Sequence, residues 1–492
     1  MTDLADLTIA QATAGLRAGE FTAIDLLEAV ERRAAVTEAH LHAYLTLDRE
    51  GARSAALAAG EAIKSGDRRP LLGIPIAVKD NMVTKGVETT AGSQILAGWK
   101  PPYSGTAVLR LEGAGAVIVG KTNLDEFAMG SSTENSAYGP TRNPWNTDTV
   151  PGGSSGGSAA VVAVGSALGA FGSDTGGSIR QPASLTGTVG AKPTYGLVSR
   201  YGLIAFASSL DQIGPIAQTV PDAATLLEAV AGWDPLDATS YHGDVPAISR
   251  SLDAGVAGLR VGVVSELTGE GIDPEVLAAT RAAIDRLADA GAEIVELSLP
   301  AIEYALSAYY LIAPAECSAN LARFDGVRYG LRVDGSTTEE MMAKTRAEGF
   351  GPEVTRRILL GTYALSAGYY DAFYGQAQRV RTLLRRDFAK AYEQVDVLVS
   401  PTSPTTAFEI GSKTTDPLTM YLADICTIAT NLAGDPGISV PVGLDAEGLP
   451  IGFQIMAPAL GEEVMFRVAA EVERRAGFNT RPHLATSKVV TP

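Results

Sequence analysis

Three residues far apart in the chain could together cleave an amide through a serine nucleophile. Ser154 and Ser178 lie 24 residues apart, each in a segment rich in serine and glycine, and Lys79 ends a short apolar run upstream of both. A serine hydroxyl is a weak nucleophile and needs a base. A lysine can be that base only when neutral, and burial lowers its pKa from about 10.4. The second serine could relay the proton between base and nucleophile.

The residues just before Ser178 have the composition of a loop that could hold a developing negative charge. Thr175, Gly176 and Gly177 precede this serine. Glycine lets successive backbone amides turn toward one point, which is the geometry that an oxyanion hole requires. The segment therefore fits the same amide-cleaving chemistry.

The same residues also have a plainer interpretation. A loop rich in glycine and serine is often a turn or an anion-binding nest, and a lysine after a strand often reaches the surface along its own aliphatic stem. Asp174 and Arg180, which flank the oxyanion segment, fit a structural ion pair that holds the loop. Residue chemistry alone leaves both interpretations open.

Two familiar motif patterns occur in the chain, and their context argues against both. Residues 115–122 fit the phosphate-loop pattern, but the positions that should form a loop are apolar and predict a buried strand followed by a turn. Residues 152–156 fit the nucleophile elbow of serine hydrolases, which needs a preceding strand and a histidine partner. No strand is expected before them, and His242 and His483 lie in polar, loop-like segments downstream.

The composition is that of a globular protein with a large core. The chain has 492 residues, of which 46% are apolar, and a net charge of −17, which disfavours unaided binding of nucleic acid. Two cysteines exclude a disulfide-rich fold and favour reduced thiols in the cytoplasm. No signal peptide is expected, and the longest apolar stretch is shorter than the ~20 residues of a membrane span.

The order of expected elements favours one α/β domain over residues 1–492, with a helical insertion at about 301–390. Residues 259–264, 274–290 and 292–297 predict a strand, a helix and a second strand, which favours parallel strands in one sheet. The other expected elements are helices in the first 65 residues, including one capped by Thr22, strands at 73–78, 116–119, 395–400, 437–442 and 450–456, a helical stretch from 302 to about 390 broken at 349–352, and a helix at 462–476.

Three blocks of the sequence resemble the amidase signature family. The blocks are a lysine at a strand end (residues 73–80), GGSSGGS (residues 152–158) and GSDTGGSIR (residues 172–180), in that order. The resemblance implies the family's α/β fold, in which helices flank both faces of a large mixed central sheet. Within the family, four further segments resemble the A subunits of glutamyl/aspartyl-tRNA amidotransferases: 125–139, 192–215, 320–330 and 356–381.

The resemblance assigns catalytic roles position by position. It implies that Ser178 is the nucleophile, that Ser154 is the bridging serine of a Ser-cisSer-Lys triad, and that Lys79 is the base. It further implies an oxyanion loop formed by the backbone of three residues, Thr175, Gly176 and Gly177.

The resemblance also implies that the substrate is glutamine, whose side-chain amide is cleaved. The α-carboxylate of glutamine needs a cation and its α-ammonium group needs an anion. Matching positions assign the carboxylate to Arg357, with Asp424 and Tyr309 completing the pocket. The neighbouring residue Arg356 is an alternative to Arg357, and Tyr310 is an alternative to Tyr309.

The resemblance finally implies partners. Ammonia would pass to the B subunit of a heterotrimer that also contains a C subunit, and the B subunit would bind ATP, Mg²⁺ and most of the tRNA. No cofactor, metal site or membrane contact is expected in this chain. The competing hypothesis is a stand-alone amidase that acts on small carboxamides. A nucleotide-binding protein and a purely structural subunit rank below both.

Overall fold

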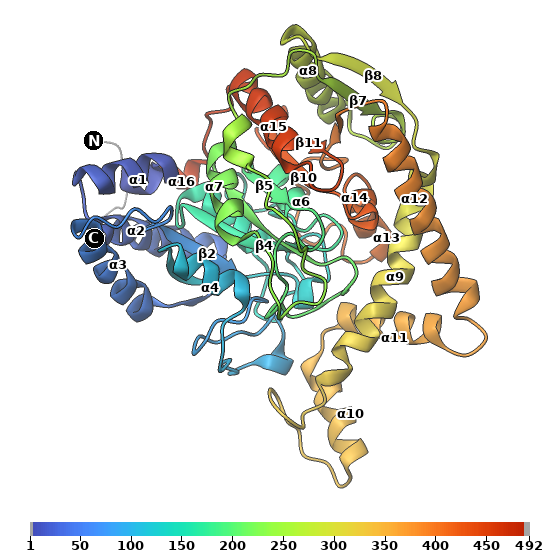
Figure 1. The fold of residues 1–492 in the computed structure, drawn as a ribbon. Coiled ribbons are helices and arrows are strands. Elements are labelled where there is room, and N and C mark those ends of the chain that lie inside the picture. The colour runs from blue at the N-terminus through green and yellow to red at the C-terminus, as the bar shows by residue number, and fades with distance from the viewer. Residues whose placement is uncertain (1–2, 487–492) are drawn as a thin grey trace.

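The computed structural model describes residues 3–486, and a mixed sheet of 11 strands runs through it (Figure 1). The order of the strands across the sheet is β1-β3-β2-β4-β6-β5-β10-β11-β9-β7-β8. The strands are β1 (Tyr44–Leu47), β2 (Pro75–Lys79), β3 (Val117–Thr122), β4 (Gly169–Asp174), β5 (Val189–Lys192), β6 (Gln212–Ala217), β7 (Arg260–Val264), β8 (Glu293–Leu297), β9 (Val397–Pro401), β10 (Gly437–Leu444) and β11 (Pro450–Met456). The predicted α/β class with a large mixed sheet and flanking helices is confirmed.

Parallel and antiparallel pairs occupy different parts of this sheet. Strand β2 runs parallel to β3 and β4, and β7 runs parallel to β8 and β9. The parallel pairing that the sequence predicts for 259–264 and 292–297 is therefore confirmed. Strands β4, β6, β5, β10 and β11 pair antiparallel in the middle of the sheet. Because the sheet is continuous, residues 169–217 and 437–456, which are far apart in the sequence, meet there.

The helix predicted after Thr22 begins where local chemistry predicts. The helix after Thr22 has a complete capping box, in which the Thr22 hydroxyl and the Asp25 side chain exchange hydrogen bonds with backbone amides. The helices are α1 (Ile9–Ala18), α2 (Ala23–Leu41), α3 (Arg49–Lys64), α4 (Thr106–Gly113), α5 (Gly156–Val164), α6 (Arg180–Thr186), α7 (Val220–Val230), α8 (Pro274–Asp289), α9 (Ala305–Asn320), α10 (Thr338–Gly349), α11 (Pro352–Leu365), α12 (Gln376–Tyr392), α13 (Pro417–Tyr421), α14 (Ile428–Ala433), α15 (Glu462–Ala476) and α16 (His483–Thr486).

The glycine-rich region contains strands that the sequence pattern does not reveal. The apolar, alanine-rich sequence between Ser154 and Ser178 is typical of a helix, but α5 ends at Val164 and β4 follows after a turn. Strand β4 is buried on both faces, so it lacks the alternation of apolar and polar residues that marks a half-exposed strand. Strand β1 likewise interrupts the first 65 residues, for which the pattern predicts only helices.

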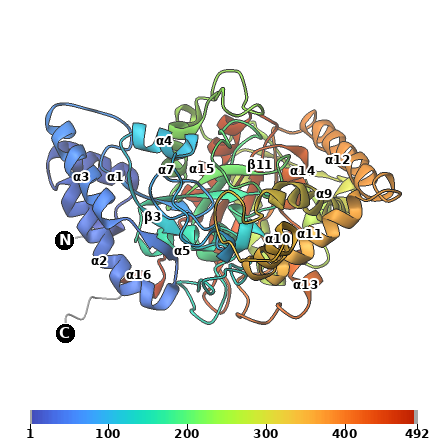
Figure 2. The ribbon, with the colours of Figure 1, turned by 90° about the horizontal axis from the view of Figure 1, so that it is seen from below.

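The segment at about 301–390 is helical and lies along one side of the molecule (Figures 1 and 2). It contains α9, α10, α11 and α12. The predicted break at 349–352 is confirmed, because α10 ends at Gly349 and Pro352 occupies the first position of α11. Figure 1 places α1, α2 and α3 on the opposite side of the molecule from these helices.

Both thiols lie in the interior of the protein. Cys317 and Cys426 are free and buried. No helix within residues 3–486 combines the length and the apolar character that crossing a bilayer would require.

Candidate active site

Lys79 is the last residue of β2 and is completely buried. Strands β3 and β4 flank β2, so the side chain cannot reach the surface along its stem. Its Nζ atom lies 2.7 Å from the hydroxyl oxygen of Ser154 and 2.8 Å from that of Ser155. It also lies 3.0 Å from the hydroxyl oxygen and 3.3 Å from the carbonyl oxygen of Ser173. The surface interpretation of this lysine is therefore wrong.

Burial lowers the pKa of Lys79 to about 7, and three buried aspartates nearby oppose the shift. A large fraction of the amine is therefore neutral near neutral pH, and a neutral amine has a lone pair with which it can accept a proton. The contacts around Nζ include hydroxyl and carbonyl oxygens and no carboxylate. The environment thus favours a lysine that acts as a base.

Ser154 stands at the N-terminal side of α5, where the bond between Gly153 and Ser154 is a cis peptide. Ser154 is completely buried, and its hydroxyl contacts Lys79. The next residue, Ser155, also contacts Lys79, and its hydroxyl donates to the Ser173 carbonyl oxygen at 3.2 Å. These two serines place α5 directly against the buried amine.

Ser178 lies in the turn between β4 and α6, beside the same serine pair. Its carbonyl oxygen accepts a hydrogen bond of 3.1 Å from the Ser155 amide. Ser178 is 7% exposed, whereas Ser154 and Lys79 have no exposed surface. A nucleophile must be accessible to the substrate, whereas its base must be shielded from solvent. The exposure of Ser178 and the complete burial of Lys79 fit these two requirements.

The oxyanion segment is held on both sides by hydrogen bonds. The Thr175 hydroxyl donates to Asp211 at 2.7 Å, and the Gly176 carbonyl oxygen accepts from the Thr427 hydroxyl at 2.7 Å. The Gly177 amide donates to Asp174 at 2.8 Å, so a substrate oxyanion would have to share or replace that bond. The amides of all three residues therefore sit in a fixed loop.

Glycine is required in this loop for steric reasons. A Cβ atom on Gly177 would lie 2.1 Å from the Thr427 hydroxyl oxygen, and φ of Gly177 is +136°. A Cβ atom on Gly176 would lie 2.8 Å from the Tyr309 ring. Tyr309 therefore packs directly on the loop that precedes Ser178.

Asp174 and Arg180 form the structural ion pair that their positions suggest. The Arg180 guanidinium contacts the carboxylate through Nε at 3.0 Å and through Nη2 at 3.0 Å, and both side chains are completely buried. Burial alone would raise the pKa of Asp174, but Arg180 outweighs it and holds the pKa at about 2. The Asn431 amide adds a bond of 2.8 Å to the same carboxylate. This charged cluster anchors the oxyanion loop to α14.

Removing the ion pair between Asp174 and Arg180 should make the folded protein less stable. We expect Arg180→Ala to lower the free energy of unfolding by about 3–5 kcal/mol, because the Asp174 carboxylate would stay buried without its counter-charge. Urea denaturation measures the change. The control is Arg356→Ala, which removes an exposed partner of Glu353 and should cost at most about 1 kcal/mol. Equal losses in the two variants would contradict the assigned role of Arg180.

The structure separates Arg357 from its neighbour Arg356. Arg357 is 3% exposed, whereas the side chain of Arg356 is 44% exposed. The Arg357 Nε atom donates to Glu353 at 2.7 Å, which uses only one of its several N–H groups. Burial would lower the pKa of Arg357, but Tyr310 and Glu353 raise it well above its usual value. Arg357 is therefore a permanent buried cation.

The two candidate tyrosines have different neighbours. Tyr309 packs against Gly176 of the oxyanion loop. Tyr310 stacks on Tyr421 with ring centroids 3.8 Å apart, and the Arg357 guanidinium lies 5.2 Å from the centre of the Tyr310 ring. Tyr309 thus faces the catalytic loop, while Tyr310 helps to enclose the arginine.

Asp424 carries a carboxylate oxygen without a partner. Its Oδ2 atom accepts a hydrogen bond from the Ser131 hydroxyl, whereas Oδ1 is buried and has no hydrogen-bond partner. Burial raises the pKa of Asp424 to about 7, opposed by Ser131 and Arg357. The backbone carbonyl of Asp424 accepts from Thr427, whose hydroxyl also reaches Gly176. The orphaned oxygen therefore lies close in the fold to the oxyanion loop.

Several residues of the site were not predicted from the sequence. Ser155 lies next to Ser154 in the GGSSGGS block, so this motif could have identified it as a site residue. Ser173 lies in the GSDTGGSIR block, and Ser131 and Asp211 lie in two of the other segments that resemble the family. Asn81, Thr427 and Asn431 lie outside these segments and are identified only by their side-chain hydrogen bonds to Ser173, Gly176 and Asp174, respectively.

Both rejected motifs take the structures expected of them. Residues 117–122 form strand β3 rather than a phosphate-binding loop. The buried Lys121 of this strand contacts Asp80 at 3.1 Å and the Met82 carbonyl at 2.8 Å. The segment before Gly152 contains no strand, and His242 packs against Trp233 rather than near Ser178. Within residues 3–486, no group of three or more His, Cys, Asp or Glu side chains could hold a metal ion.

Known proteins resemble this chain in sequence and in fold over almost its whole length. The family model described as Amidase matches residues 25–466. The A subunit of the glutamyl-tRNA(Gln) amidotransferase of Salinispora arenicola is 58% identical over 98% of this chain and 100% of that protein. The crystal structure of the Thermotoga maritima protein of the same name is 41% identical with a TM-score of 0.81, covering 98% of this chain and 97% of that one. The peptide amidase of Stenotrophomonas maltophilia is 32% identical with a TM-score of 0.82, covering 97% and 99%. The resemblance seen in the sequence motifs is confirmed: the chain belongs to the amidase family.

Proposed function

We propose that this chain is the glutamine-hydrolysing A subunit of a tRNA-dependent amidotransferase. The observation that carries the proposal is the buried Lys79 amine, 2.7 Å from the Ser154 hydroxyl and 2.8 Å from the hydroxyl of Ser155, whose backbone amide donates to the Ser178 carbonyl. The unpartnered oxygen of Asp424 and the buried cation of Arg357 add the charges that an amino-acid substrate needs. The high identity to A subunits over the full chain supports the same function.

The proposed reaction proceeds through an acyl-enzyme. Neutral Lys79 takes a proton from Ser154, which takes one from Ser178 as the Ser178 oxygen attacks the amide carbon of glutamine. The backbone amides of the oxyanion loop stabilise the tetrahedral oxyanion. The C–N bond then breaks, and the proton returns along the relay to the leaving ammonia. Water, activated by the same relay, attacks the acyl-enzyme and releases glutamate.

The proposed pocket recognises both charges on the α-carbon of glutamine. The α-ammonium group would bind the free oxygen of Asp424, and the α-carboxylate would pair with the Arg357 guanidinium. Tyr309 would close the space between these charges and the oxyanion loop. A stand-alone amidase for small apolar carboxamides has no use for such a pair of buried charges.

The expected partners follow from this assignment. Ammonia would pass to the B subunit, which would bind ATP and Mg²⁺ and amidate Glu-tRNA(Gln), Asp-tRNA(Asn) or both, with the C subunit alongside. No cofactor is expected in this chain, and the net charge of −17 suits a protein that leaves tRNA binding to its partner. The expected site of action is the cytoplasm.

Substituting Asp424 tests the choice between glutamine and simple amides. We expect Asp424→Asn to reduce kcat/KM for glutamine by roughly 100-fold, because a neutral amide cannot pair with the α-ammonium group. Ammonia release is measured with glutamine and with a short primary amide that lacks the α-ammonium group. The rate with the short amide should change by no more than a few-fold.

The wild-type chain provides the decisive comparison. Strong preference for glutamine, with stimulation by the B and C subunits, ATP and Glu-tRNA, is the expected result. Broad turnover of simple amides that ignores the partners, together with equal losses on both substrates in Asp424→Asn, would instead identify a stand-alone amidase.

A further inference from the structure

The carboxylate of Glu353 holds the arginine that the proposed function assigns to the α-carboxylate of glutamine. Glu353 lies in the first turn of α11, one helical turn before Arg357, and both side chains are buried. The Arg357 Nε atom donates to Glu353 Oε1 at 2.7 Å. This bond takes one edge of the guanidinium and leaves the N–H groups of its two Nη atoms for a ligand. That pair of donors can bind a carboxylate through both of its oxygens.

Three aromatic rings surround the Arg357 guanidinium. Its central carbon lies 5.5 Å from the centre of the Phe206 ring, 5.2 Å from that of Tyr310 and 5.4 Å from that of Tyr421. An aromatic ring attracts a guanidinium through its π electrons and does not use the N–H groups of the cation. The rings therefore restrain the arginine while its donors stay available to a substrate.

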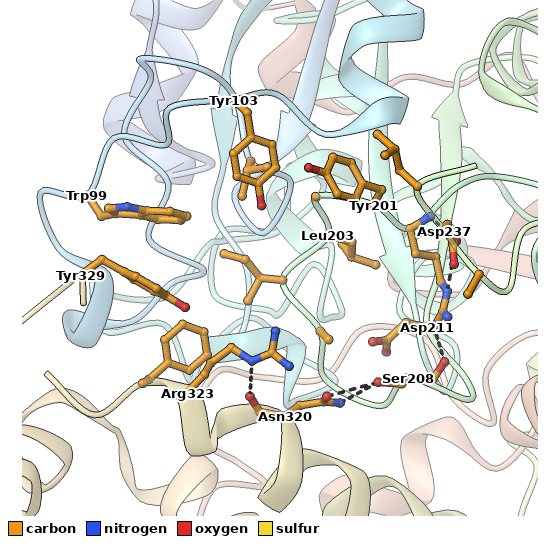
Figure 3. Close-up of a pocket in the computed structure, with 18 residues that line it drawn as sticks. Trp99, Tyr103, Tyr201, Leu203, Ser208, Asp211, Asp237, Asn320, Arg323 and Tyr329 are labelled. Atoms are coloured by element: carbon orange, nitrogen blue, oxygen red, sulfur yellow. Dashed lines mark hydrogen bonds and ion pairs between the residues drawn. The ribbon is translucent and has the colours of Figure 1, made fainter. Parts of the chain in front are cut away.

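The Phe206 side of this aromatic enclosure is fixed from behind. The Phe206 amide donates to the Asp211 carboxylate at 3.0 Å, and the Phe206 carbonyl accepts from the Asn320 side chain at 3.1 Å. Figure 3 shows Asp211 and Asn320 where they line a neighbouring cavity of about 410 Å³. The enclosure is therefore tied to the loop before β6 and to the end of α9.

The same oxygen of Glu353 also holds the segment that carries Asp424. The Tyr421 hydroxyl donates to Glu353 Oε1 at 2.9 Å. Tyr421 is the last residue of α13, and Asp424 is the last residue of the helical turn that follows, Leu422–Asp424. The bond between Glu353 and Tyr421 therefore joins the helix of Arg357 to the segment of Asp424.

A cavity of about 230 Å³ lies at this junction. Arg357 and Tyr421 line it, and so do Gly130 and Ser132. The serine between these last two residues donates its hydroxyl hydrogen bond to Asp424. The cation in the wall of the cavity and the anion one hydrogen bond away are the two charges that the proposed function assigns to glutamine.

We propose that Glu353 is a positioning residue for the recognition of glutamine. One oxygen of its carboxylate sets the direction of the Arg357 guanidinium and, through Tyr421, the spacing between Arg357 and Asp424. The inference rests on the proposed function, which supplies a substrate with two charges on its α-carbon. Glu353 contacts none of the catalytic residues, so its removal should change KM for glutamine far more than kcat.

The alternative role of Glu353 is competition for the charge of Arg357. A carboxylate that neutralised this arginine would weaken the binding of the substrate carboxylate, and its removal would then lower KM. The second oxygen of Glu353 contacts the exposed Arg356, so one carboxylate is shared between two guanidinium groups. A net positive charge therefore remains for the substrate, and this arrangement favours positioning over competition.

Two substrates measure the effect of removing the Glu353 carboxylate. The second substrate is 4-aminobutanamide, which has the carboxamide and the ammonium group of glutamine and lacks only its α-carboxylate. We expect Glu353→Ala to raise KM for glutamine by about tenfold or more, with kcat changed by no more than a few-fold. Glu353→Gln should keep KM within a few-fold of the wild type, because its amide oxygen can still accept from Arg357 and Tyr421. With 4-aminobutanamide, kcat/KM should change by no more than a few-fold in both variants.

Tyr421→Phe is a milder variant that keeps the ring and removes only the hydroxyl group. We expect it to raise KM for glutamine by about threefold, and to add nothing in the Glu353→Ala background, because the hydroxyl acts through Glu353. The matched controls are Tyr363→Phe and Glu348→Ala, at exposed residues of α11 and α10, which should leave KM unchanged. Thermal unfolding checks each variant, and the shift in Tyr421→Phe decides the question if Glu353→Ala does not fold.

Direct binding separates this inference from the proposed function. Calorimetry measures glutamine binding to Ser178→Ala, which cannot form an acyl-enzyme, with and without Glu353→Ala. Weaker binding in the double variant supports positioning, even if hydrolysis by the wild type shows no preference for glutamine, a result that would reject the proposed function alone. Unchanged or tighter binding, or equal losses on both substrates, would overturn the role of Glu353 and leave the proposed function standing. Failure of Ser178→Ala to bind glutamine would overturn both.

Discussion

Replacing Ser178 with alanine should abolish glutamine hydrolysis while the protein remains folded. The expected loss in kcat is roughly 10⁴-fold or more, because no acyl-enzyme can form without the nucleophilic oxygen, and only the oxyanion loop and substrate binding remain to accelerate attack by water. Ammonia release from glutamine measures the loss. A burst of ammonia before steady state in the wild type, and its absence in the variant, would locate the loss in acylation.

The control for Ser178 is another buried serine. Ser166 is 1% exposed and its hydroxyl bonds to the Val161 carbonyl, away from Lys79. Ser166→Ala should retain the wild-type rate. Thermal unfolding of Ser178→Ala should show little change, because the structure gives this hydroxyl no buried bond on which the fold depends. Glutamine-dependent turnover that persists in Ser178→Ala would remove this serine from the mechanism.

Replacing Lys79 with methionine should cause the second largest loss. Methionine keeps the unbranched apolar stem but has no amine, so the relay from Ser178 through Ser154 loses its proton acceptor. We expect kcat/KM to fall by about 10²–10⁴-fold, the usual contribution of a positioned base. The measurement is ammonia release from glutamine at several pH values.

The pH profile of the wild type gives an independent measure of the same group. The pKa of Lys79 is about 7, and its amine can accept a proton only when neutral. The rate should therefore rise as the pH increases through about 7 and level off above it. In Lys79→Met, the residual rate should lose this dependence. A wild-type rate that stays constant between pH 6 and pH 8 would be inconsistent with lysine as the base.

A second buried lysine serves as the control for Lys79. Lys192 ends β5, is 1% exposed, and donates to the backbone carbonyls of Pro193 and Asp435. Burial lowers its pKa to about 8, yet it contacts no serine of the site. Lys192→Met should therefore reduce stability far more than activity. Near-wild-type activity in Lys79→Met would refute its place in the relay.

Sequence patterns located most of the strands but missed β1, β4, β5 and β6. The strand–helix–strand unit of β7, α8 and β8 was predictable, because its helix has period 3.6 and its strands are short apolar runs next to turns. Strands β4 and β5 lie in the glycine-rich segment 151–202 and β6 follows it, and all three are buried on both faces. Such strands carry no alternation of apolar and polar residues.

The residues that can perform the chemistry were identifiable before any fold was known. Lys79, Ser154 and Ser178 stand out because a lysine at the end of an apolar strand and serines among glycines are unusual for a purely structural role. The family resemblance then assigned a role to each of them. It also reduced the candidates for carboxylate binding to Arg356 and Arg357.

Tertiary packing sets the environment of these residues. Burial of Lys79 depends on β3 and β4, which come from distant parts of the sequence, and that burial lowers its pKa. Arg357 is buried and Arg356 is exposed because of which face of α11 turns inward. The unpartnered oxygen of Asp424 depends on how α14 packs against the oxyanion loop. Desolvation and unsatisfied hydrogen bonds arise from contacts between distant segments, so a linear sequence specifies the reactive groups but not the environment that activates them.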